Sequence, residues 1–227
     1  MMMRAAFACA AAVAALLTAG AASAQSAPEV AWNLGVVSDY VFRGYSQTLE
    51  DPAIQGGVDA TIGAFYVGAW ASNVDFGDDT NAEVDLYGGY RGEAAGFAFD
   101  VGAVGYAYVN APAGADYDYV ELKAAASRAI GPATFGAAVY WSPDFFGLDE
   151  AATYVEANAA FAPADKWTVS AAVGHQSLDV NDDYTTWNIG VGYAVTDHVA
   201  IDVRYHDTDV DGPLSEGRAV AGVKFLF

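Results

Sequence analysis

The chain alternates apolar and polar residues with a period of two from about residue 30 to its last residue. In one segment Ile201, Val203 and Tyr205 share a face, and Asp202 and Arg204 occupy the opposite face. Because successive side chains of a β-strand point to opposite faces, this period predicts strands with one apolar and one polar face. About twelve such segments of roughly ten residues follow one another, which is the length that a tilted strand needs to cross a bilayer.

The connections between these segments alternate between short and long. Twelve strands need eleven connections, and the sequence predicts five short turns and six longer, mostly acidic loops. Short periplasmic turns and longer outer loops are typical of outer-membrane barrels. The fold prediction is therefore all-β: a transmembrane antiparallel up-and-down β-barrel of about twelve strands, whose first strand runs through Arg43. The expected longer loops are residues 45–52, 74–82, 110–118, 143–152, 178–184 and 207–217.

The distribution of charge separates a membrane barrel from a soluble two-sheet sandwich, which alternates as well. Of the nine Lys and Arg residues, all except Arg4 are expected on the polar face or in short turns, and none on the apolar face. A charge facing lipid would cost about 2–4 kcal/mol at the membrane midplane. A charge-free face on every strand therefore favours the barrel. The net charge of −20 argues against nucleic acid as a partner.

The N-terminus has the three parts of a secretory signal peptide. Arg4 precedes an apolar run at residues 5–20, and an A-x-A cleavage site follows at residues 22–24. A retained transmembrane helix is the weaker alternative, because the run is rich in alanine and a processing site ends it. We expect a cleaved signal peptide at residues 1–24, a barrel domain at 25–227, and a location in the outer membrane of a Gram-negative bacterium. The only cysteine, Cys9, lies in the signal, so the exported chain should form no disulfide.

Four stretches of the sequence are similar to a known family. They are "SDYVFRGYSQT" at residues 38–48, "PAIQGGVD" at 52–59, "GAFYVGAWASNVDF" at 63–76 and the terminal "GVKFLF". With these stretches the chain resembles the Gcw_chp family of proteobacteria, also called the TorF family of porins. The resemblance implies an exported outer-membrane β-barrel with a porin-like role, but no established substrate and no catalytic residues. It also implies an insertion signal at Phe225 and Phe227, read by the barrel-assembly machinery. Outer-membrane lipid and lipopolysaccharide are the other expected partners.

Two functions fit a barrel with a charged interior. The first is a narrow porin-like channel for small hydrophilic solutes or cations, and the alternative is a structural or adhesive barrel with a plugged lumen. Eight strands leave an interior filled by side chains and sixteen leave a channel, so twelve strands admit both. The predicted lumen-lining charges are Asp39, Arg43, Asp59, Glu83, Asp85, Arg91, Asp100, Glu121, Lys123, Glu156, Asp202, Arg204, Arg218 and Lys224.

Asp39 and Arg43 stand four residues apart on the polar face of the first predicted strand. At about 3.4 Å per residue they would lie roughly 13–14 Å apart, too far to pair with each other. We therefore expect Arg43 to pair across the lumen, with Asp59 or Glu83 as candidates. The planar guanidinium can contact two carboxylate oxygens at once.

One loop has the spacing of a calcium-binding loop. In "DTDVDG" the acids Asp207, Asp209 and Asp211 alternate and Gly212 follows, as at the start of an EF-hand loop. The twelfth position is Arg218, however, where an EF-hand has a bidentate Glu. A solvated acidic loop is the alternative. No cofactor is otherwise expected, apart from Ca²⁺ or Mg²⁺ at the acidic outer loops.

A more distant alternative is an outer-membrane lipid hydrolase. His175 and Ser177 lie on one face near the outer end of a predicted strand, in the H-x-S pattern of outer-membrane phospholipases. The outward residues predicted on the next strand are Thr185 and Trp187, and neither supplies the Asn or acid that would orient the histidine. The sequence therefore predicts that the chain is not an enzyme.

Overall fold

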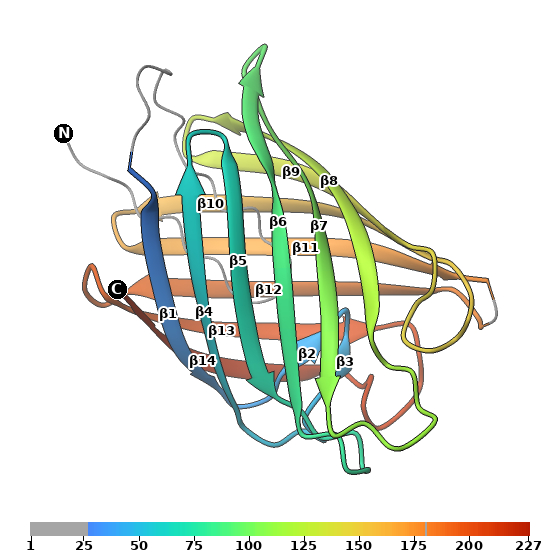
Figure 1. The fold of residues 1–227 in the computed structure, drawn as a ribbon. Coiled ribbons are helices and arrows are strands. Elements are labelled where there is room, and N and C mark those ends of the chain that lie inside the picture. Colours follow the sequence, from blue (N-terminus) through green and yellow to red (C-terminus); the bar gives the residue numbers. More distant parts are fainter. Residues whose placement is uncertain (1–26, 180) are drawn as a thin grey trace.

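In the computed structural model, which describes residues 27–179 and 181–227, twelve antiparallel strands close into a barrel (Figure 1). β1 pairs with both β4 and β14, so the sheet has no free edge. β2 and β3 form a separate hairpin. The strands are β1 (Glu29–Val37), β2 (Val41–Phe42), β3 (Tyr45–Ser46), β4 (Ala53–Ile62), β5 (Phe65–Asn73), β6 (Ala82–Ala94), β7 (Phe97–Val109), β8 (Tyr119–Ile130), β9 (Ala133–Ser142), β10 (Ala152–Ala164), β11 (Trp167–Leu178), β12 (Tyr184–Ala194), β13 (Val199–Thr208) and β14 (Arg218–Leu226).

The barrel is apolar outside and polar inside. Trp32 and Phe65 expose 63% and 65% of their surface, whereas Glu83, Glu121 and Gln176 expose 1% or less. A water-soluble domain buries its large apolar side chains instead. The predicted all-β barrel of about twelve strands, with its apolar face outward, is confirmed. No helix among the described residues is long and apolar enough to cross a membrane.

The short turns lie at one end of the barrel and the long loops at the other (Figure 1). β14 ends at the short-turn end, where the Phe227 amide donates to the Trp32 carbonyl at 2.9 Å and the two rings lie 6.2 Å apart. Phe225 and Phe227 face outward, with 40% and 68% of their surfaces exposed. These contacts close the barrel; the role of the two phenylalanines in insertion stays a prediction.

Arg128 lies in a different place from the one that the sequence predicted. Arg128, expected in a short turn, instead lies on the exposed outer face of β8, two residues before the strand ends, with its guanidinium over the Phe97 ring. A long basic side chain in this place can reach the lipid headgroups while its stem covers apolar surface.

The predicted signal peptide, with Cys9, lies outside the described residues.

The prediction that the first strand runs through Arg43 is wrong. β1 ends at Val37, and residues 38–52, which we call the inner segment, fold back as the β2–β3 hairpin. The two-residue turn of this hairpin is Arg43-Gly44, and both residues have positive φ, 45° and 89°. Such turns match the twist of paired strands, and Asn-Gly or Asp-Gly is their usual sequence. Because arginine occupies the first position of this turn, the sequence pattern does not identify it.

The outward apolar face generates the first testable prediction. Ile189 is 54% exposed on β12, between the outward rings of Trp187 and Tyr193. Ile189→Arg should lower the free energy of unfolding in lipid vesicles by about 2–4 kcal/mol, because the charge would face hydrocarbon. Urea titration in vesicles measures this, with Ile189→Leu as the matched control. Equal stability of the two variants would contradict a lipid-facing β12.

Candidate functional site in the barrel lumen

The inner segment crosses the lumen and brings Arg43 to the wall opposite its own strand. Its tight turn fits against β12 and β13. A Cβ added at Gly44 would lie 2.1 Å from Cγ2 of Thr208 and 2.9 Å from Oγ1 of Thr186. Gly44 therefore serves two purposes: it permits the positive φ of the turn and the close approach of the turn to the wall.

The Arg43 guanidinium forms a bidentate ion pair with Glu121 of β8. The distances are 2.7 Å from Nη1 to Oε1 and 2.8 Å from Nη2 to Oε2. Nη1 also donates to Oε1 of Gln176 at 3.0 Å, and the Tyr106 hydroxyl donates to the second Glu121 oxygen at 3.0 Å. Arg43 exposes 8% of its surface and Glu121 1%. This is the strongest geometry available to an arginine and a carboxylate.

Aromatic faces surround the same guanidinium. Its central carbon lies 4.3 Å from the ring centroid of Tyr154, 5.1 Å from that of Tyr140 and 4.8 Å from that of Phe42. Cation–π contacts of this kind gain strength when water is excluded. The sequence suggested Asp59 or Glu83 as the partner of Arg43, and this prediction is wrong. The hairpin carries Arg43 past β4 and β6 to the far wall, where Glu121 binds it.

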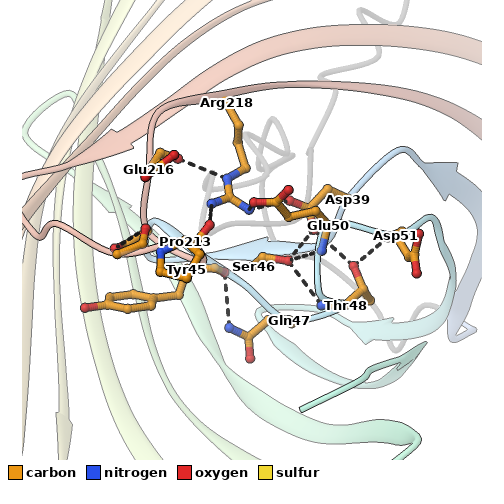
Figure 2. Close-up of polar contacts among 12 residues, drawn as sticks. Asp39, Tyr45, Ser46, Gln47, Thr48, Glu50, Asp51, Pro213, Glu216 and Arg218 are labelled. Carbon is orange, nitrogen blue, oxygen red and sulfur yellow. Dashed lines mark hydrogen bonds and ion pairs between the residues drawn. The ribbon is translucent and has the colours of Figure 1, made fainter. Parts of the chain in front are cut away.

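The base of the inner segment is held by a second polar cluster, shown in Figure 2. Nη1 of Arg218, on β14, contacts Asp39 Oδ2 at 3.1 Å and Glu50 Oε1 at 3.2 Å. The hydroxyls of Ser46 and Thr48 both donate to Asp39 Oδ1, at 2.7 and 3.0 Å. Asp39 therefore joins the two halves of the segment to each other and to the barrel wall.

Further contacts attach the inner segment to β6 and to two outer loops. The Tyr40 hydroxyl donates to Glu83 of β6 at 3.0 Å. The backbone amide of Ser46 donates to the Leu214 carbonyl, and the Gln47 carbonyl accepts from the amide of Asp75, both at 2.8 Å. Contacts with walls on opposite sides place the segment inside the barrel, toward the end with the long loops (Figure 1).

Several predicted lumen charges pair with one another away from the inner segment. Asp100 accepts from Tyr66 at 2.7 Å and contacts Lys123 at 2.9 Å and Arg91 at 3.3 Å. Arg204 contacts Asp202 of its own strand at 3.3 Å and donates to Asn188 of β12 at 2.6 Å and to Ser170 of β11 at 2.8 Å. Each of these two clusters joins strands of the same wall and does not cross the lumen.

Two of the remaining predicted lumen acids, Asp59 and Glu156, bind polar neutral groups. Asp59 accepts from the Tyr87 hydroxyl at 2.8 Å, and Glu156 accepts from the Asn158 amide at 3.0 Å. Asp85 is 9% exposed, and its Oδ1 is buried without a hydrogen-bond partner among the described residues. Glu83 and Asp85 form no ion pair within the described part of the chain. The predicted lumen residues comprise eight acids and six bases.

A cavity of about 100 Å³ lies beside the base of the inner segment. β1, β4, β5 and β12–β14 form its wall, so it is on the side of the lumen away from Glu121. Its size suffices for several water molecules. The polar and aromatic side chains in its lining include Asp39, Gln55, Trp70, Asp202, Arg204 and Lys224.

The alternating aspartates of the β13–β14 loop do not converge. Asp207 accepts from the Tyr205 hydroxyl and the Thr208 amide, whereas Asp209 accepts from the Thr185 amide at 2.7 Å. Within residues 27–179 and 181–227, no group of three or more His, Asp or Glu side chains is placed to hold a metal ion. The carboxylates of this loop, Asp211 included, therefore give no geometric support to the calcium site, which stays an untested expectation.

The His175 and Ser177 pair has an acidic neighbour that the alternation of inward and outward side chains did not predict. His175 Nε2 lies 3.6 Å from Asp183 Oδ2, and Nδ1 lies 3.2 Å from the Thr185 hydroxyl. Both ring nitrogens thus face groups other than Ser177, and no His175–Ser177 hydrogen bond occurs among the described contacts. A hydrolytic triad needs one ring nitrogen on the serine and the other on the acid. This arrangement gives no support to hydrolysis.

Sequence reasoning placed Glu121 in the lumen but missed its role, together with those of Gln176 and Tyr154. All three lie on inward positions of their strands, so parity alone could have put them inside. Their convergence on Arg43 depends on the inward hairpin, whose only local signal is the glycine after Arg43.

Comparisons with known proteins support the fold. The model of the Gcw_chp family, described as a bacterial protein of unknown function, matches residues 21–225. No curated protein sequence matches significantly. Three porins or channels are among the solved structures that share the fold at low identity. The KdgM porin has a TM-score of 0.61 and 8% identity, over 88% of this chain and 99% of that one.

The other two structures cover similar shares. The NanC porin has a TM-score of 0.57 and 11% identity, over 87% of this chain and 98% of that one. The COG4313 outer membrane channel from Pseudomonas putida F1 has a TM-score of 0.57 and 9% identity, over 87% and 94%. The fold is thus that of small outer-membrane barrels.

The buried ion pair generates the second prediction. Arg43→Ala should lower the free energy of unfolding by about 3–5 kcal/mol, because it leaves Glu121 buried without a countercharge. Arg43→Ala combined with Glu121→Gln should recover much of this loss, since no unpaired charge remains at this site. Urea unfolding in detergent micelles measures both of these variants and Glu121→Gln alone. Arg128→Ala is the control, because its exposed guanidinium should contribute within about 0.5 kcal/mol. Simple additivity of the two substitutions would count against a coupled pair.

Proposed function

The chain belongs to the Gcw_chp family, and we propose that it is a narrow outer-membrane channel for small hydrophilic solutes, with a preference for cations. The observation that carries this proposal is the lumen itself. It is lined by charged and polar side chains and retains a cavity of about 100 Å³ beside the inner segment. A barrel interior filled with apolar side chains would offer water no such space.

The proposed preference for cations rests on the balance of lumen charges. Acids outnumber bases, and Glu83 and Asp85 form no ion pair among the described residues. A passage lined mainly by one sign of charge raises the local concentration of the opposite ion. The acids that support the proposal are Asp39, Asp59, Glu83, Asp85, Asp100, Glu121, Glu156 and Asp202, against Arg43, Arg91, Lys123, Arg204, Arg218 and Lys224.

A structural or adhesive barrel with a closed lumen is the second candidate. The contacts of the inner segment favour it, because Arg43, Tyr40 and Asp39 attach the segment to β8, β6 and β14. The two candidates differ in one respect. In a channel the inner segment narrows a path that stays open, whereas in a structural barrel the segment closes the lumen.

Single-channel recording in planar bilayers separates the two. The wild type should show a small conductance that favours K⁺ over Cl⁻. A variant in which residues 39–51 are replaced by a short Gly-Ser linker should conduct several times more. A wild type that does not conduct, beside a deletion variant that does, would show that the segment closes the lumen and would overturn the channel proposal. A folded deletion variant that does not conduct would overturn it as well.

A point substitution tests the role of Arg43 in the same assay. Arg43→Ala should raise the conductance and increase the preference for cations, because it removes a positive charge and a contact of the segment with the wall. Arg128→Ala changes the same residue type on the outer face and should leave the current unchanged. An unaltered current in Arg43→Ala would show that Arg43 neither restricts nor selects.

A further inference from the structure

Four side chains from four consecutive strands surround the Arg43 guanidinium. They are Glu121 of β8, Tyr140 of β9, Tyr154 of β10 and Gln176 of β11, and we call them the Arg43 cage. All four are at least nine-tenths buried, with 1%, 5%, 4% and 0% of their surfaces exposed.

The cage belongs to the barrel wall. Tyr154 is directly paired in the sheet with Tyr140 on one side and Gln176 on the other, so three members form one row across β9, β10 and β11. Glu121 is oriented by the Tyr106 hydroxyl of the neighbouring strand. The strand pairing that fixes these positions does not involve the inner segment.

Arg43 itself, in contrast, belongs to no strand of the barrel wall. Arg43 lies in the turn of the β2–β3 hairpin and has a φ of 45°, a conformation that residues other than glycine seldom adopt. Strain of this kind persists where surrounding contacts over-determine it. Here those contacts are the ones that the guanidinium makes with the cage.

The chemistry of the cage is specific for a flat, delocalised cation. Glu121 offers two oxygens to the two ends of a guanidinium, and the Gln176 carbonyl oxygen accepts a further N–H. The rings of Tyr140 and Tyr154 present their faces to the positive charge. An ammonium group lacks the fork that fits the carboxylate, so guanidinium is the better match.

Arg43 leaves one polar group of the cage unsatisfied. Nε2 of Gln176 is buried without a hydrogen-bond partner among the described residues. Buried donors are rarely left in this state, and such exceptions call for an explanation. A ligand that carries an acceptor oxygen beside its guanidinium could satisfy this donor as well as the carboxylate.

We propose that the Arg43 cage is a binding site for guanidinium-type organic cations and that Arg43 is its tethered occupant. A free ligand of this class competes with Arg43 for Glu121. Because a tethered group acts at an effective concentration in the millimolar range, the ligand must reach that range to displace it. The further consequence, that displacement frees the inner segment and raises conductance, rests on the proposed channel function.

Chemical rescue of Arg43→Ala tests the site. Millimolar methylguanidinium chloride should raise the melting temperature of this variant in detergent micelles by about 3 °C or more, as expected for a ligand that binds only the folded state. Equal concentrations of NaCl and of methylammonium chloride control for ionic strength and for the shape of the cation. Both should give at most a small rise.

Two further variants make the result specific. Arg43→Ala/Glu121→Gln lacks the carboxylate and should show no rescue, and Arg43→Ala/Tyr154→Leu should show a weaker one. Equal rescue in the presence and absence of Glu121 would overturn the proposal. If Arg43→Ala does not fold, methylguanidinium is added during refolding. Restored folding supports the cage, and an unchanged yield counts against it.

Recordings of the wild type separate this proposal from the channel proposal. Methylguanidinium should raise the conductance relative to NaCl at equal ionic strength. Rescue of stability without any current would support the cage and overturn the channel. A current in the wild type together with no rescue in Arg43→Ala would support the channel and overturn the cage.

Discussion

The bidentate ion pair between Arg43 and Glu121 is the contact on which the arrangement of the lumen depends. It joins the turn of the inner segment to β8 at 2.7 and 2.8 Å, in a site where both side chains are almost fully buried. Two buried charges are tolerated only when each satisfies the other with good geometry. Gly44 permits the approach of the turn to the wall, and Asp39 with Arg218 holds the base of the segment. Together these contacts narrow a barrel whose twelve strands would otherwise enclose a wider space.

The inverted polarity of the barrel makes this arrangement possible. The apolar outer face disfavours charge away from the strand ends, where Arg128 lies, so most charged side chains of the strands collect in the lumen. There they can pair across it or along one wall. Arg91, Asp100 and Lys123 pair along the wall. Arg43 instead reaches across, because it is carried on a hairpin that leaves the sheet. The same physical constraint therefore accounts for the exposed aromatics outside and for the ion pairs within.

The strand count, the face of each strand and the alternation of connections could be predicted because a period of two is a local property of the sequence. The inner segment could not. Tyr40 and Phe42 continue the parity of Trp32, and the turn has arginine where asparagine is usual, so "SDYVFRGYS" reads as a continued strand. The partner Glu121 is 78 positions away and becomes a neighbour only through closure of the barrel. Parity predicted which residues face inward, but their partners depend on the hairpin.

The position of the inner segment is the central claim, and cysteine labelling tests it most directly. The only cysteine of the sequence, Cys9, lies in the predicted signal peptide. Val41 is 4% exposed within the segment, whereas Asp79 is exposed on an outer loop. With a bulky, membrane-impermeant maleimide applied to intact cells, Val41→Cys should react much more slowly than Asp79→Cys, and adding Arg43→Ala should accelerate it. Equal rates for Val41→Cys and Asp79→Cys with Arg43 intact would contradict a segment held inside the barrel.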